Sequence, residues 1–114
     1  MESVREVFYY GNYYLSFFER QNKIVQKKLN WVVGVVSTTQ RVPVIFFKHI
    51  TGTDGLYEIR VESGGNIFRI FCFFEIENKL ILLNAFQKKE NKTPRNQIAL
   101  AKKLKNEYEE EKNK

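Results

Sequence analysis

Two arginines on neighbouring predicted strands are the residues of this sequence best placed to do chemistry. The dipeptide Gly64-Gly65 separates two runs of alternating residues, 56–63 and 67–77, and therefore predicts a tight hairpin. The register of such a hairpin places Arg60 directly opposite Arg69. Like charges at opposed positions repel each other. A phosphate held between two guanidinium groups would reverse that repulsion, so the pair is a candidate phosphate site.

Further cations are expected on the same face. With an even-length turn near Asn78, a strand over 80–86 brings Asn84, Phe86 and the following Lys88 to the face of the two arginines. Because cations beside aromatic rings suit single-stranded RNA, this face predicts an RNA-binding surface. The remaining candidates for phosphate or RNA contact are Lys48, His49, Lys89 and Lys92.

A structural interpretation of the arginines is equally open at this point. In it, Arg60 pairs with Glu58 or Glu62, and Arg69 points into solvent. The second face also carries Phe71 and Phe73, with Leu80 and Leu82 expected beside them. Such an apolar face indicates cover by a partner or by the C-terminal helix.

The sequence predicts a single α+β domain over residues 1–114. An N-terminal strand over 5–10 is followed by helices over 12–20 and 22–39, a connection over 44–54, and an antiparallel meander. In the last strand of the meander, Ile81, Leu83 and Ala85 are expected to face the first two helices. Thr93-Pro94 predicts the start of a C-terminal helix, whose end from about residue 109 is expected to fray.

Composition narrows the function classes. Hydrophobic residues make up 43% of the 114 residues, which is enough for a core, and 19 Lys and Arg against 13 Asp and Glu give a net charge of +6. This balance suits a polyanionic partner. A lone Cys72 cannot form an internal disulfide, and the acidic residues lack metal-ligand spacing. The sequence has neither a signal peptide pattern nor a membrane-length apolar run, so we expect a cytoplasmic protein without membrane contact.

Several motifs in fixed order resemble a known family. The segment from Leu56 to Tyr108 contains Leu-Tyr-Glu-Ile-Arg, a Gly turn, Phe-Arg-Ile-Phe, Phe-Gln-Lys-Lys and Lys-Thr-Pro. This series resembles the phage-derived HigB-like branch of the RelE/ParE toxin superfamily, and residues 25–43 match it more loosely. The resemblance implies a RelE-like fold, with a strand and two helices packed on a meander sheet that carries a C-terminal helix.

The resemblance also implies an activity. HigB-like and RelE-like toxins cleave mRNA on the translating ribosome, without metal or cofactor, and are neutralised by an antitoxin that is often a helix-turn-helix protein. The residues matching the basic site are Arg60, Arg69 and Lys88. We expect the two arginines to stabilise charge on the phosphorane, and Lys88 or His49 to transfer a proton.

One departure from the superfamily leaves the general acid or base open. Some members carry Tyr or His near the end of the sheet, whereas here the only such residue after Phe86 is Tyr108. Two other functions therefore stay open. One is a toxin that poisons DNA gyrase, as ParE-like relatives do, and the other is a non-catalytic nucleic-acid-binding module.

Overall fold

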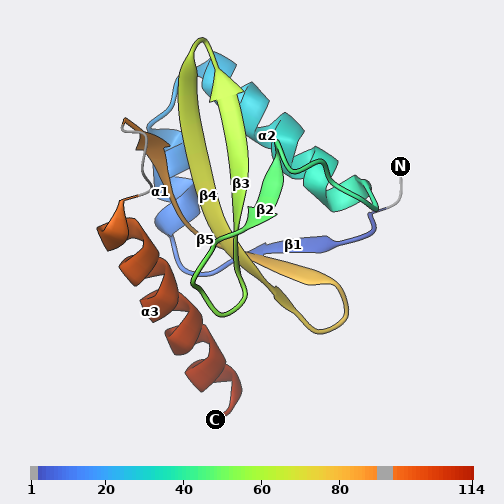
Figure 1. The fold of residues 1–114 in the computed structure, drawn as a ribbon, viewed down its shortest axis with the longest axis vertical. Coiled ribbons are helices and arrows are strands. Elements are labelled where there is room, and N and C mark those ends of the chain that lie inside the picture. Colours follow the sequence, from blue (N-terminus) through green and yellow to red (C-terminus); the bar gives the residue numbers. More distant parts are fainter. Residues whose placement is uncertain (1–2, 90–93) are drawn as a thin grey trace.

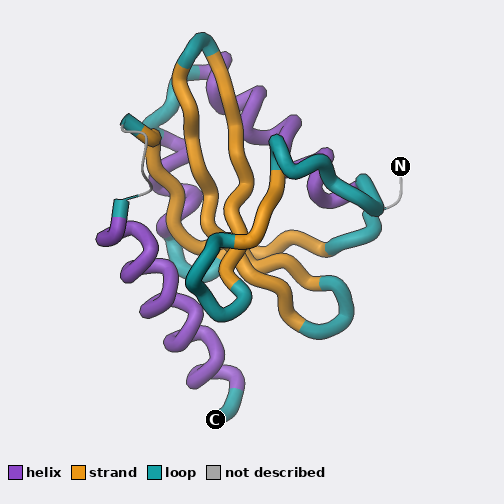
Figure 2. Tube along the Cα trace, viewed as in Figure 1, coloured by secondary structure: helices purple, strands orange, loops and turns teal. Residues whose placement is uncertain are grey.

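The alternating apolar runs form a five-stranded sheet with helices on both faces (Figures 1 and 2). The computed structural model describes residues 3–89 and 94–114. Its elements confirm the predicted α+β class. They are β1 (Glu6–Tyr9), α1 (Tyr13–Glu19), α2 (Lys23–Thr38), β2 (Phe47–His49), β3 (Leu56–Ser63), β4 (Asn66–Glu75), β5 (Lys79–Lys88) and α3 (Arg95–Lys112).

The sheet has the strand order β1-β5-β4-β3-β2. Strand β1 runs parallel to β5, and the other neighbours are antiparallel. The predicted hairpin is confirmed, because Arg60 pairs with Arg69 across β3 and β4. Gly64 and Gly65 connect the two strands at φ of 57° and 80°. Both lie in the left-handed region, where glycine has no steric penalty, so this dipeptide fixes the register.

The region 44–54, expected to be a connection, contains the short edge strand β2. Its register places Lys48 opposite Glu58 on β3. A strand of three residues is too short to show an alternating pattern, and its pairing depends on β3 rather than on local sequence. Strand β2 matters for the site because it brings Lys48 beside the arginine hairpin.

The expected side-chain directions in β5 are correct at its end and wrong at its start. Three residues connect β4 to β5, not an even number, with Glu77 and Asn78 at positive φ. The register then shifts between Ile70 and Cys72, where β5 contains one extra residue. Such a bulge reverses the alternation of side chains. Phe86 and Lys88 therefore reach the arginine face as predicted.

The three-residue connection explains the errors in the first half of β5, before the bulge restores the predicted alternation. Ile81 and Leu83 pack on the side of α3, whereas Leu80 and Leu82 pack with α1 and α2, which is the reverse of the expectation. Ala85, which follows the bulge, lies on the side of α1 and α2 as predicted.

Helices α1 and α2 cover one face of the sheet. The apolar stripe of α2 includes Leu29, Val32 and Val36, all fully buried, as the three- and four-residue spacing predicts. The side chain of Asn22 caps this helix by accepting a hydrogen bond from the Val25 backbone N–H at 2.9 Å. At α1, Asn12 precedes the helix but donates to the hydroxyl of Ser16 and caps no backbone group.

Helix α3 covers part of the opposite face of the sheet. This confirms the prediction that the C-terminal helix covers the apolar residues of that face. Ala101 and Leu104 pack against Phe71 and Phe73 in a second core cluster. The helix begins at Arg95 with Pro94 as its N-cap, and Thr93 lies outside the described residues. It continues through Lys112, and fraying from about residue 109 stays a prediction.

The end of α3 is anchored to the sheet by Glu75. This carboxylate accepts hydrogen bonds from the Tyr108 hydroxyl and the Lys112 ammonium group. The hydrogen bond from Lys112, followed by that from Tyr108, lowers the pKa of Glu75. Because the folded-state pKa lies below the unfolded one, the stability that Glu75 contributes is present above the unfolded pKa. It is lost as the pH falls through the folded pKa.

We therefore expect Glu75→Gln to lower the free energy of unfolding by about 1 kcal/mol at neutral pH. The difference from the unmodified protein should shrink to nothing at acid pH, as measured by urea denaturation. Glu77→Gln is a matched control, because Glu77 is exposed and lies 4.0 Å from Lys79. A Glu75 effect that is independent of pH would contradict the anchor.

Candidate functional site

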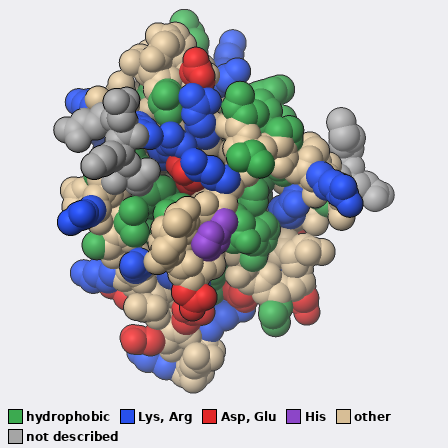
Figure 3. Space-filling view, in the orientation of Figure 1, with side chains coloured by type: hydrophobic (Ala, Val, Ile, Leu, Met, Phe, Trp, Pro, Cys, Tyr) green, Lys and Arg blue, Asp and Glu red, His purple; other side chains and the backbone are tan. Residues whose placement is uncertain are grey.

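A cluster of charges occupies the part of the sheet face that α3 leaves uncovered. We call it the cationic cluster; it consists of Lys48, Glu58, Arg60, Arg69 and Lys88, from strands β2, β3, β3, β4 and β5 respectively. Four cations and one carboxylate give it a net charge of +3. Figure 3 shows Lys and Arg side chains gathered on this face with an acidic side chain among them.

The centre of the cluster is a buried ion pair. Arg69 Nη1 lies 2.7 Å from Glu58 Oε2, and both residues are almost fully buried, with exposed fractions of 6% and 5%. Arg69 therefore neither points into solvent nor offers a free guanidinium to a phosphate. Its Nε is also buried and has no hydrogen-bond partner within residues 3–89 and 94–114. Arg69 holds Glu58, and Glu58 in turn pairs with Lys48 of the cluster.

Two cations above this pair are accessible. The side chain of Lys48 is 52% exposed and its Nζ lies 3.6 Å from Glu58 Oε1. The side chain of Arg60 is 26% exposed and its Nη2 lies 3.3 Å from Glu62 Oε2. The predicted alternative was thus correct about Arg60, which pairs with Glu62. That pair leaves Arg60 within reach of a ligand, since the Glu62 side chain is 56% exposed and the interaction is weak in water.

Lys88 completes the cluster from β5, where it pairs with Ile67 of β4. Desolvation lowers the pKa of Lys88, and repulsion by the Arg69 charge lowers it further. The charges of Lys48 and Arg60 act in the same direction, whereas Glu58 opposes them. A lysine whose pKa is lowered gives up its proton more readily near neutral pH, which is what proton transfer requires.

Other predicted contact residues are not brought into the cluster. The ring of His49 packs edge-on against Tyr57 at 5.3 Å, and its Nε2 lies 3.1 Å from the backbone oxygen of Thr53. Phe86 is 8% exposed and packs edge-on against Phe71 in the core beside α3. It therefore offers no ring face to a nucleotide, because helix α3 covers this part of the sheet.

Of the two predicted contact lysines that follow Lys88, the structure describes only Lys89. Lys89 is exposed directly after the end of β5. Lys92 lies outside the described residues.

Glu58 is the residue that the sequence-based site omits. It lies at the centre of the cations and pairs with two of them, Lys48 and Arg69. The signal was available in part, because Glu58 and Arg60 are two residues apart and so share one face of β3. What the spacing could not show is that Arg69 reaches diagonally to Glu58.

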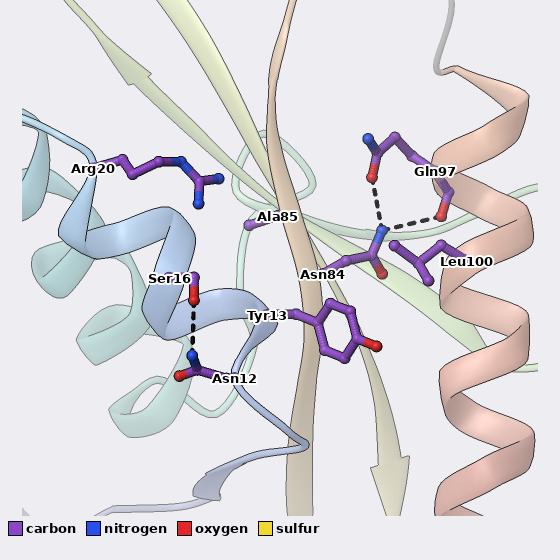
Figure 4. A pocket seen from close by; sticks show the side chains of 8 residues that line it. All are labelled: Asn12, Tyr13, Ser16, Arg20, Asn84, Ala85, Gln97 and Leu100. Atoms are coloured by element: carbon purple, nitrogen blue, oxygen red, sulfur yellow. Dashed lines mark hydrogen bonds between the residues drawn. The ribbon is translucent and has the colours of Figure 1, made fainter.

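A separate cavity of about 520 Å³ lies beside β5, between α1 and α3 (Figure 4). Asn84, placed on the α3 face as predicted, lines it and donates through Nδ2 to the backbone oxygen and Oε1 of Gln97, at 3.1 and 2.9 Å. Asn12, Tyr13, Ser16, Arg20, Ala85 and Leu100 complete the lining. Among the described residues that line it, none belongs to the cationic cluster and Arg20 is the single cation.

The described residues offer neither a metal site nor a membrane-spanning helix. Across 3–89 and 94–114, no group of three or more His, Cys, Asp or Glu side chains is arranged to hold a metal ion. Over the same ranges, every helix is too short or too polar to cross a bilayer.

Fold and site together define a small α+β protein with a cationic cluster on one face of its sheet. Residues 16–106, about four fifths of the chain, match the family model described as phage-derived protein Gp49-like (DUF891). The chain therefore belongs to the Gp49-like family, a toxin-type family similar to RelE and HigB. The search of curated proteins gives no match.

Proposed function

We propose that this chain is the toxin of a type II toxin-antitoxin system and that it cleaves mRNA on the ribosome. The observation that carries the proposal is the cationic cluster, in which exposed Lys48, partly exposed Arg60 and Lys88 surround the buried Glu58–Arg69 pair. Membership of a toxin-type family supports it. The cluster's net charge of +3, offset in part by Glu62 beside Arg60, is suited to the phosphate backbone of RNA.

In the proposed reaction, the 2′-hydroxyl of a ribose gives up its proton to a water molecule, its oxygen attacks the adjacent phosphorus, and the bond to the 5′-oxygen breaks. A 2′,3′-cyclic phosphate and a free 5′-hydroxyl result. Arg60 and Lys48 would hold the phosphate and stabilise the negative charge that grows on the phosphorane. Lys88, with its lowered pKa, would donate the proton that the leaving 5′-oxygen needs.

Glu58 and Arg69 would act as positioning residues in this scheme. Glu58 holds Lys48 at 3.6 Å, and Arg69 holds Glu58. The proposed partners are mRNA, the ribosome and an antitoxin of the helix-turn-helix type.

Induction of the chain in growing bacteria tests the proposal. We expect growth arrest and transcripts cut within the reading frame, and both effects should be relieved by Arg60→Ala and by Lys88→Ala. Lys102→Ala is a matched control, because Lys102 is an exposed lysine on α3 outside the cluster. Cleavage should be mapped by sequencing transcript 5′ ends.

Two results would contradict the proposal. Arrest with intact mRNA and inhibited DNA supercoiling would favour gyrase poisoning instead. Salt-sensitive RNA binding without arrest or cleavage would favour a non-catalytic nucleic-acid-binding module.

A further inference from the structure

An open groove leads away from the cationic cluster between α2 and the tip of the β3–β4 hairpin. It consists of two adjoining hollows of about 340 and 460 Å³, which share Lys28. The first hollow includes Arg60 of the cluster. The second includes Trp31. The groove therefore connects a proposed phosphate contact to a large aromatic side chain.

Trp31 is unusually accessible for its size. It is 54% exposed on α2, although its neighbours Leu29 and Val32 on the same helix are fully buried. Its indole contacts the ring of Phe46 edge-on at 6.0 Å, and Lys28 Nζ lies 5.0 Å from the centroid of the indole. Exposed apolar side chains, Ile24 and Ile45, flank it. Grouped exposure of this kind marks a binding surface.

The charges along the groove select the class of ligand. Lys27, Lys28 and Arg60 line it, while its acidic residue, Glu62, is paired with Arg60 at 3.3 Å. A positive groove with an accessible aromatic ring is how proteins hold single-stranded nucleic acid, since phosphates contact the cations and a base stacks on the ring.

We propose that this groove binds the single strand next to the scissile phosphate, with a base stacked on Trp31 and a phosphate on Lys28. The inference rests on the proposed function, because it extends the RNA away from the cationic cluster. An acidic protein segment could also cover an apolar and cationic groove. The continuity with the phosphate site favours nucleic acid.

The sequence contains a single tryptophan, so its fluorescence reports on this groove alone. The probe is an oligonucleotide of about eight 2′-O-methyl uridines, which cannot undergo attack by a 2′-hydroxyl, so binding is measured apart from cleavage. We expect it to quench Trp31 fluorescence. A dinucleotide of the same chemistry, long enough for the cationic cluster alone, should bind weakly and leave the fluorescence unchanged.

Variants identify the contact. Measured by anisotropy of a labelled octamer, Trp31→Ala should weaken binding by about tenfold, and Trp31→Phe should keep most of the affinity. Lys28→Gln should lower the salt slope of binding by about one. Ile76→Ala is the matched control, because it removes an apolar residue that is 75% exposed in the β4–β5 turn and should have no effect.

The outcomes separate this inference from the proposed function. If the octamer binds, depends on Arg60 and leaves Trp31 unquenched, the groove is overturned and the cationic cluster stands. If neither probe binds, the groove is overturned, and the induction experiment decides the proposed function separately. If an acidic peptide quenches Trp31 while the octamer does not, the groove is a protein-binding surface and the inference is wrong.

Discussion

Replacing Arg69 by alanine is expected to lower the free energy of unfolding by about 3–5 kcal/mol, the largest stability effect predicted for the site. The reason is the burial of its partner. Glu58 is 5% exposed, so removal of the guanidinium at 2.7 Å leaves a buried carboxylate that water cannot solvate. Urea denaturation at neutral pH measures the effect.

The control for Arg69 lies directly opposite it in the hairpin. Arg60 has the same side chain, but its partner Glu62 is exposed, so Arg60→Ala should cost less than about 1 kcal/mol. The double variant Glu58→Gln, Arg69→Met should recover much of the stability lost in Arg69→Ala, because it removes the buried carboxylate, which in Arg69→Ala keeps only the exposed Lys48 at 3.6 Å. Equal costs for the two single arginine variants would contradict a buried pair.

Replacing Arg60 by alanine is expected to have the largest effect on activity. If Arg60 stabilises charge on the phosphorane, its loss should slow single-turnover cleavage of a ribosome-bound mRNA by about 10²–10³-fold. The protein should remain folded for the reason given above. This combination of lost activity and kept stability separates a catalytic residue from a positioning residue such as Arg69.

Arg60→Lys sharpens the measurement, since a lysine keeps the charge but cannot form two parallel hydrogen bonds to one phosphate. The cleavage rate of Arg60→Lys should lie between the rates of the native protein and of Arg60→Ala. Lys102→Ala on α3 should cleave at the native rate. Native-rate cleavage by Arg60→Ala would place the catalytic centre elsewhere.

Local sequence was sufficient to predict those elements whose structure depends on residues close together in the chain. The glycine pair sets the β3–β4 hairpin because left-handed backbone is free of penalty at glycine, and this alone fixes Arg60 opposite Arg69. The period of Leu29, Val32 and Val36 fixes α2 in the same way. In both cases the deciding interactions lie within a few residues of each other.

The exposed groove at Trp31 shows where such reasoning ends. The helical period places Trp31 off the stripe of Leu29, Val32 and Val36, but no local pattern shows what lies beside it. Its exposure depends on α2 packing against β3 through a different stripe. The position of Phe46 beside it is likewise set by a connection that returns from the end of α2.

By itself, the sequence determined the α+β class, the hairpin with its opposed arginines, the positive charge and the resemblance to a toxin-type family. The tertiary structure decided which of those charges are accessible. Strand β2 brings Lys48 to Glu58, and a bulge in β5 brings Lys88 to the same face. The burial of Arg69 against Glu58 follows from these strands meeting. Burial is a property of the assembled sheet, because the neighbours that exclude water from a side chain come from distant parts of the chain.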